Sequence, residues 1–265
     1  RSPLIIKGPR QVGKTETIDY FAAHNYRSVV EINFVEEPKY RAITADGYGA
    51  DTIVRNISLI NPAKKFIPGD TLIFFDEIQA HPDIVTALKF FKIDGKYDVI
   101  CSGSMLGISY KQIESNSVGY KTDYEMRSLD FEEFLWARGY DEAVIESMFT
   151  HLCDATPFSE VEMNVFSTAF MDYCVLGGMP AVVASHIRTG TFEGTLQLQR
   201  QLILDYQEDI RKYAQGLDQA RILNVFNHIP VQLARKQKFQ ISKVASGARF
   251  KAIEDAWNGL KPREW

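Results

Sequence analysis

Short apolar runs alternate with helical patterns through the first half of the chain. Five runs are candidate strands: PLIIKG (3–8), RSVVEINF (27–34), TLIFFDE (71–77), YDVICSGS (97–104) and the alternating KTDYEMRSL (121–129). Helical spacing of apolar residues lies between them, notably at 14–24 and 83–91. Because short buried strands separated by helices are typical of a parallel sheet covered on both faces, we predict an α/β core.

From residue 140 onward the pattern becomes nearly all helical. Two stripes of residues recur at intervals of three and four, which is the period of an amphipathic helix. The first stripe is Met163, Phe166, Phe170 and Tyr173, and the second, with one polar member, is Phe192, Leu196, Gln199, Ile203, Tyr206, Ile210 and Tyr213. The sequence GGMP (177–180) separates the stripes as a turn. We interpret both stripes as core-packing faces.

These patterns divide the chain into a core (1–139), a helical lid (140–228) and a basic segment (229–265). The basic segment contains six cations and no acidic residue between positions 235 and 251, namely Arg235, Lys236, Lys238, Lys243, Arg249 and Lys251. Two short helical patterns broken at 246–247 favour the start of a helix-turn-helix or winged-helix-like module, with DNA as a candidate partner. A solvated helix face explains the same charges, and both interpretations stay open.

Composition narrows the class of protein. The chain has 265 residues, a net charge of −4 and a pI of about 5.8, which argues against a protein that coats nucleic acid or membrane over its whole surface. No apolar run approaches the roughly 18 residues of a membrane span, and we expect a cytoplasmic protein. The chain opens without methionine and ends at LKPREW, so we expect both ends to be trimmed.

The cysteines and histidines give no sign of a disulfide or a metal centre. Cys101, Cys153 and Cys174 show no pairing pattern, which favours a reducing compartment. The sequence HLC (151–153) resembles half of a metal site, but no second half follows, and we expect an ordinary packing role.

The sequence GPRQVGKT (8–15) fits the phosphate-binding pattern G-x-x-x-x-G-K-[ST]. Such a loop wraps a polyphosphate with backbone N–H groups, and the helix that follows offers its positive end to the phosphates. We predict that Lys14 reaches the β- and γ-phosphates and that the Thr15 hydroxyl holds Mg²⁺. The predicted nucleotide-binding residues are Gly8, Pro9, Arg10, Gln11, Val12, Gly13, Lys14, Thr15 and Glu16.

Two acids follow the continuous apolar run at 71–75. A buried strand has no structural use for two carboxylates at its tip, since each must be solvated or paired. Beside the phosphate loop, Asp76 would hold the Mg²⁺ shell, and Glu77 would orient or deprotonate the attacking water. The next apolar run ends in small hydroxyl residues, and Ser102 or Ser104 would contact the γ-phosphate or that water.

These three elements, in this order, resemble the AAA+ ATPases. The resemblance implies an ASCE-type P-loop NTPase with sheet order 5-1-4-3-2, nucleotide at the carboxyl ends of the strands, and a helical lid. GPRQVGKT, FFDEIQ, CSGSMLG, SLDFEEFLWARG and YCVLGGMPAVV look, more narrowly, like a bacterial and archaeal AAA+ group with a C-terminal domain of unknown function 4143. By position, Gly8, Gly13, Lys14 and Thr15 match Walker A, Asp76 and Glu77 match Walker B, and Ser102 or Ser104 matches the sensor.

The arginines depart from the pattern of ring-forming AAA+ proteins, which usually carry an arginine finger shortly before the fifth strand. Residues 105–122 contain no arginine. Arg127 and Arg138 are the remaining finger candidates, and the lid arginine that touches nucleotide would be Arg200, Arg211 or Arg221. A ring hexamer is therefore not implied, and a monomeric or dimeric switch-like ATPase fits as well.

The leading functional hypothesis is an Mg²⁺-dependent ATPase. ATP is preferred over GTP because no N-K-x-D guanine signature follows the phosphate loop. The alternative is a nucleotide-gated DNA- or protein-binding switch with little turnover. A third reading is an interaction domain that has lost its chemistry, and the intact Lys14, Asp76 and Glu77 argue against it.

Overall fold

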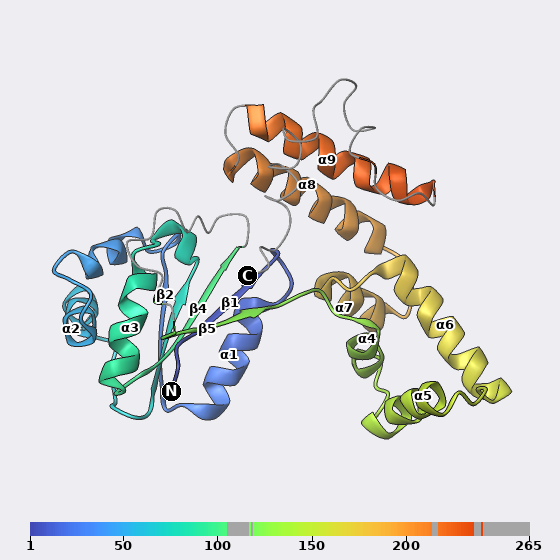
Figure 1. Cartoon of the computed structure of the whole chain (residues 1–265), viewed down its shortest axis with the longest axis horizontal. Helices are drawn as coiled ribbons and strands as arrows, with labels where there is room; N and C mark the ends of the chain where they lie inside the picture. The colour runs from blue at the N-terminus through green and yellow to red at the C-terminus, as the bar shows by residue number, and fades with distance from the viewer. Residues whose placement is uncertain (105–116, 118, 214–216, 236–239, 241–265) are drawn as a thin grey trace.

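The computed structural model of the chain describes residues 1–104, 117, 119–213, 217–235 and 240. It consists of an α/β part followed by a helical part, which lie side by side (Figure 1). Within these residues, no helix has the length and apolar character needed to cross a membrane.

Five parallel strands form one sheet. They are β1 (Leu4–Gly8), β2 (Ser28–Asn33), β3 (Thr71–Asp76), β4 (Asp98–Ser104) and β5 (Thr122–Glu125). Their order across the sheet is β2-β3-β4-β1-β5, and every neighbouring pair is parallel. Each strand falls within one of the predicted apolar runs. Read from the β5 edge, the order is 5-1-4-3-2, which confirms the predicted topology.

Helices cover both faces of the sheet (Figure 1). They are α1 (Lys14–Asn25), α2 (Ala50–Ile60) and α3 (Ile84–Asp94), with 3-10 turns at Pro38–Thr44 and Ile78–Ala80. Strand β3, which lies between β2 and β4, is buried along its whole length, and its alternate residues serve opposite faces. Ile73 and Phe75 pack in the cluster that includes α2 and α3, whereas Phe74 packs with Ile18 and Ala22 of α1.

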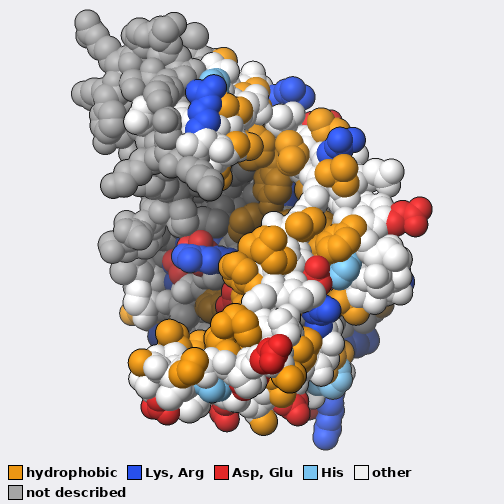
Figure 2. Space-filling view, turned by 90° about the vertical axis from the view of Figure 1, so that its right-hand side faces the viewer, with side chains coloured by type: hydrophobic (Ala, Val, Ile, Leu, Met, Phe, Trp, Pro, Cys, Tyr) orange, Lys and Arg blue, Asp and Glu red, His pale blue; other side chains and the backbone are white. Residues whose placement is uncertain are grey.

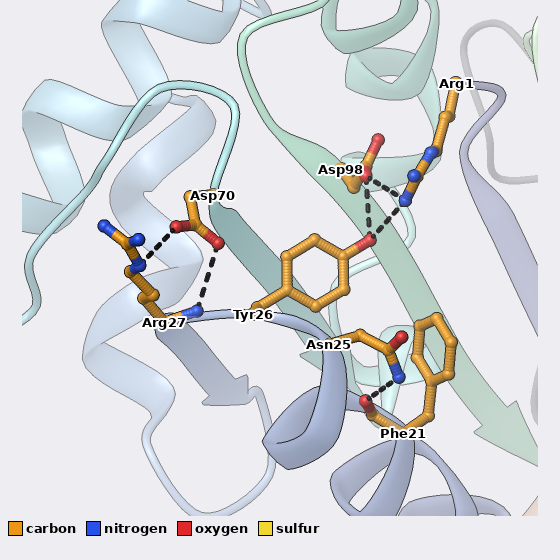
Figure 3. A network of polar contacts seen from close by, with 7 residues as sticks. All are labelled: Arg1, Phe21, Asn25, Tyr26, Arg27, Asp70 and Asp98. Atoms are coloured by element: carbon orange, nitrogen blue, oxygen red, sulfur yellow. Dashed lines mark hydrogen bonds and ion pairs between the residues drawn. The ribbon is translucent and has the colours of Figure 1, made fainter.

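A polar network connects the segments at the end of the sheet where the strands begin (Figure 3). The Tyr26 hydroxyl donates to Asp98 at 2.7 Å, and the Arg1 guanidinium donates to both groups. Beside it, Arg27 forms an ion pair with Asp70 just before β3. These contacts fix the end of α1 to the starts of β3 and β4. They lie at the amino ends of the strands, opposite to the predicted nucleotide-binding site. We therefore assign them to stabilisation of the fold.

The helical part contains α4 (Phe131–Ala137), α5 (Glu142–Asp154), α6 (Glu160–Leu176), α7 (Pro180–Thr189), α8 (Thr195–Tyr213) and α9 (Leu217–Ala234). Helix α4 begins with a capping box in which the side chains of Asp130 and Glu133 accept from each other's backbone N–H groups. The predicted helical character of this region is confirmed. Helix α9 runs past residue 228, and the domain boundaries stay predictions.

The connection from β5 to α4 is fixed at both of its ends. Met126 N donates to Lys7 O at 2.7 Å, and Leu129 N donates to Gly178 O at 2.8 Å. A Cβ atom on Gly178 would lie 1.9 Å from Leu129 O, so only glycine fits this approach. The GGMP turn between α6 and α7 therefore packs directly on the connecting segment.

The two predicted stripes are only partly core. In α6, Phe166 is buried, but Met163 and Phe170 are each 50% exposed. In α8, Ile210 is buried, whereas Ile203 is exposed together with Phe192 and Leu196 near the start of that helix. The prediction that both stripes pack in a core is wrong for the exposed members.

These stripe residues are exposed because the helical part packs around small clusters and not around one continuous core. Among the described residues, this part has two small clusters of buried side chains, one around Phe134 and Leu176 and one around Leu135 and Ile145, and Ile210 and Val225 are buried outside both clusters. Each cluster covers only part of a helix face. Hydrophobic side chains are accordingly spread over the surface of this part (Figure 2).

Candidate nucleotide-binding site

The phosphate loop connects the carboxyl end of β1 to the start of α1. Two of its residues have left-handed backbone conformations, Gln11 with φ of 63° and Gly13 with φ of 91°. Left-handed residues in such a turn bring successive N–H groups to one side and create a concavity that suits an anion. The side chain of Val12, which belongs to this loop, is buried.

Packing alone requires glycine at position 8. A Cβ atom at this position would lie 2.2 Å from the carbonyl oxygen of Met126, which is the residue that follows β5. The phosphate-loop pattern predicts that Gly8 lets the backbone approach phosphate. In the structure, a backbone segment already occupies the space that a side chain would need.

Lys14 folds back over the loop. Its ammonium group donates to the carbonyl oxygens of Gly8 at 3.1 Å and Pro9 at 2.7 Å. Burial lowers the pKa of Lys14, the carboxylates of Glu77 and Asp76 oppose this effect, and the Arg10 charge adds to it. Lys14 thus lies between the loop and the two predicted acids.

Asp76 is the point at which four elements meet. Its Oδ1 accepts from the Ser102 hydroxyl at 2.7 Å and from Glu77 N at 2.9 Å. Its Oδ2 accepts from Asn33 Nδ2 at 3.2 Å and lies 3.5 Å from the Thr15 hydroxyl. The side chain is buried, and both of its oxygens have hydrogen-bond partners. The ends of β2, β3 and β4 and the start of α1 are thereby brought together.

Oxygen ligands of this kind suit Mg²⁺. A Thr15 hydroxyl beside the Asp76 carboxylate offers one or two protein oxygens, which is the usual protein share when substrate phosphates and waters complete the shell. Among the described residues, no group of three or more His, Cys, Asp or Glu side chains is arranged to hold a metal by itself. The donor set therefore fits a magnesium ion that arrives with a polyphosphate.

Glu77 follows directly and has a left-handed backbone, with φ of 54°. A non-glycine residue held there costs of the order of 1–3 kcal/mol, and such strain is concentrated at functional sites. The Gln79 amide donates to its carboxylate. Glu77 is also the carboxylate that acts most strongly on the pKa of Lys14.

Asn33 is the residue that the sequence argument missed. It lies at the tip of β2, in register with Asp76 of β3. Its amide nitrogen donates to Asp76, and its Oδ1 accepts from the N–H groups of Val35 and Glu36. The signal was present, because RSVVEINF carries a polar residue, Asn33, just before its last position, at the end of the sheet where the predicted site lies.

The two candidate sensor serines have different outcomes. Ser102 is buried and bonded to Asp76, so it belongs to the cluster. The backbone of Ser104 pairs in register with Gly8, while its side chain lies outside the described residues. Glu16 lies in the first turn of α1 and is exposed.

Arg10 and Gln11 make contacts with α8 that the sequence did not predict. The Nε atom of Arg10 lies 2.6 Å from Oδ2 of Asp209. The Gln11 amide donates to Asp205 at 2.7 Å, and the Tyr206 hydroxyl donates to the carbonyl oxygen of Arg10 at 2.9 Å. In Figure 1, α8 runs across the end of β1. We call these three contacts the α8 latch.

The other arginine predictions gain little support. Arg127 is exposed and paired with Glu125, and Arg138 is paired with Asp172 in the helical part. The remaining candidates are Arg200 and Arg211, which are exposed on α8, and Arg221 on α9. In the basic segment, Arg235 is exposed, and Lys236, Lys238, Lys243, Arg249 and Lys251 lie outside the described residues.

Residues 1–135, about half of the chain, match the family described as "AAA domain". The chain belongs to this family. The AAA domain match and the observed sheet order together show a P-loop NTPase fold of the AAA type.

The C-terminal match corrects one prediction. Residues 167–261 match "Domain of unknown function (DUF8612)", so the predicted domain of unknown function 4143 is wrong. The motifs quoted for that group occur mostly in the AAA domain, and they do not specify which domain follows.

Known structures and curated proteins add no functional argument. No curated protein matches the sequence. The structure of C. elegans PCH-2 is similar at 10% identity with a TM-score of 0.33, covering 60% of this chain and 42% of that one. A DNA replication initiation factor is similar at 11% identity with a TM-score of 0.34, covering 98% of this chain and 81% of that one.

Proposed function

We propose that the protein is an Mg²⁺-dependent ATPase that converts ATP to ADP and phosphate and couples this reaction to movement of its helical part. The carrying observation is the convergence on Asp76, where Thr15, Ser102 and Asn33 contact one carboxylate beside Lys14. Hydroxyl, carboxylate and ammonium groups at the carboxyl ends of parallel strands are the groups that phosphoryl transfer needs.

The phosphate loop would bind the triphosphate. Its N–H groups and Lys14 supply the positive charge, and Lys14 exchanges the carbonyl oxygens of Gly8 and Pro9 for phosphate oxygens. Thr15 and, through water, Asp76 would hold Mg²⁺. The ion, when bound, supplies charge neutralisation on the phosphates.

Glu77 is the proposed general base. It follows Asp76 at the strand tip, and its strained backbone turns the chain out of β3. A carboxylate there would accept a proton from the attacking water, which typically contributes 10²–10⁴-fold to the rate. Ser102 would hold Asp76 in position from β4.

The test is phosphate release from ATP with Mg²⁺, compared between wild type and Glu77→Gln. We expect the variant to lose at least 100-fold in turnover, within the range for a general base, while ATP binding persists. Glu146→Gln is the matched control, because it makes the same change on the exposed surface of α5. GTP is measured in parallel, and faster hydrolysis of GTP would contradict the preference for ATP.

Duplex DNA is included as a second condition, because the basic segment motivates the switch hypothesis. Binding of ATP without turnover, with or without DNA, would replace the ATPase by a nucleotide-gated switch. Stimulation by DNA would identify the partner class, with affinity falling steeply as salt rises. Failure to bind ATP both by the wild type and by Asp209→Asn, which removes the charge that pairs with Arg10, would refute the proposal.

A further inference from the structure

The α8 latch joins two regions that belong to different families. Arg10 and Gln11 lie in the AAA domain, whereas Asp205, Tyr206 and Asp209 lie in the DUF8612 region. Positions 205 and 209 are one helical turn apart, so both carboxylates are on the same side of α8. One face of this helix therefore meets the phosphate loop with two acids and a phenol.

The central contact is an ion pair between the buried Asp209 and the partly exposed Arg10. Asp209 is 5% exposed, and burial raises the pKa of its carboxyl group, while Arg10 and Lys212 oppose this rise. A carboxylate in such a place depends on its cation. Arg10 is therefore the main group that opposes the rise in the pKa of Asp209, and its guanidinium is engaged by the helix.

Arg10 also lies within electrostatic range of the phosphate-binding lysine. Its charge lowers the pKa of Lys14, so the two cations act on the same space. Guanidinium groups bind phosphate and carboxylate with the same planar fork of donors. A triphosphate bound at Lys14 would attract Arg10 and repel the carboxylates of Asp205 and Asp209.

We propose that the α8 latch is an autoinhibitory contact in which the carboxylates of α8 compete with the phosphates of ATP for the loop, so that ATP binding releases α8. This inference rests on the proposed binding of ATP. By linkage, a partner that binds α8 when it is released raises the affinity for ATP. ATP raises the affinity for that partner by the same factor.

Release of α8 would reach the rest of the DUF8612 region. The Gln207 amide donates to Asn227 of α9 at 2.9 Å, and the rings of Tyr206 and Phe226 lie 6.4 Å apart. Helix α9 thus rests on the latch helix through side chains next to the latch itself. The position of α9 would report whether the loop holds phosphate.

The first test is the affinity for fluorescent ATP and ADP, measured by anisotropy for wild type, Asp209→Asn and Glu208→Gln. Asp209→Asn should bind ATP about tenfold more tightly, a typical size for coupling between sites. ADP should gain less, because it carries less charge. Glu208→Gln is the control, since Glu208 is an exposed acid on the same helix. Weaker or unchanged ATP binding by Asp209→Asn would overturn the inference.

The second test measures the distance between α1 and α9 by energy transfer. Dyes are placed at Tyr20→Cys and Asn224→Cys, both exposed positions, after Cys153 and Cys174 are changed to serine. ATP should lengthen the distance in the wild type, and Asp209→Asn should show the longer distance without nucleotide. No change in either case would overturn the latch.

These two tests separate failure of the latch from failure of the proposed function. If the wild type binds no nucleotide but Asp209→Asn does, the latch stands and is simply strong. If neither protein binds nucleotide, the ATPase proposal fails, and the inference that ATP releases the latch fails with it. Wild-type binding with no change in Asp209→Asn refutes the latch alone.

Discussion

Substitution of Gly8 by alanine should destabilise the fold before it affects any ligand. The added Cβ atom would lie 2.2 Å from Met126 O and 3.2 Å from the carbonyl carbon of the same residue. Carbon and carbonyl oxygen approach no closer than about 3.3 Å in ordinary contacts, so the two backbones must separate by about 1 Å. That separation works directly against the 2.7 Å bond from Met126 N to Lys7 O.

The expected loss follows from these two effects. Overpacking of this kind costs about 1–3 kcal/mol, and a buried backbone bond whose partners are left unpaired costs about 1–3 kcal/mol. A backbone shift that relieves the clash weakens the bond, so the two costs trade against each other and do not add in full. We therefore expect Gly8→Ala to lower the free energy of unfolding by about 2–5 kcal/mol.

Chemical denaturation without nucleotide measures this loss directly. Gly49→Ala is the control, because a Cβ atom there meets only the Thr52 hydroxyl at 3.6 Å, an ordinary contact, and φ is −62°. We expect the control to change stability by less than about 1 kcal/mol. If Gly8→Ala unfolded at the same denaturant concentration as wild type and lost only nucleotide binding, the packing argument would be refuted and the ligand argument would stand alone.

Two further predictions concern Asn33 in the candidate site and Asp123 on the edge strand β5. Asn33→Ala removes a donor to Asp76, so ATP turnover should fall about tenfold, as expected for loss of a hydrogen bond to a charged group. The affinity for ATP should change less than about threefold. If a steady-state assay gave the same turnover for the variant and the wild type, a positioning role for Asn33 would be excluded. Burial works to raise the pKa of Asp123, but Lys121 and Lys7 outweigh it and lower the pKa. Its stabilisation should therefore be present above the ordinary carboxyl pKa and lost as pH falls through the lowered value, so Asp123→Asn should cost stability at pH 7 and progressively less toward pH 3.

The local motifs were predictable because each places its chemistry within a few residues. GPRQVGKT and the acids after an apolar strand identified Lys14, Thr15 and Asp76 without any knowledge of the sheet. The order of the strands came from the family resemblance, since apolar runs do not reveal which strands are neighbours. Asn33 was missed for that reason, because its role depends on β2 lying beside β3.

Other features depend on contacts between distant parts of the chain. The pairing of Arg10 with Asp209 joins residues that are far apart in the sequence, and neither neighbourhood carries a sign of the other. The stripes on α6 and α8 show the opposite limit. A 3.6-residue period identifies a helix and its apolar face, but it does not indicate what covers that face, and Phe170 and Ile203 are left exposed.

The connection between β5 and α4 has a mechanical consequence. Met126 is held to β1 on one side, and Leu129 is held to the turn after α6 on the other. Only Arg127 and Ser128 lie between these two attachments. A rotation of the helical part against the sheet that keeps both attachments must be absorbed by the backbone torsions of these two residues. Arg127 and Ser128 would act as hinge residues. Because α8 is a long helix, a small rotation at this hinge would displace its far end by a large distance.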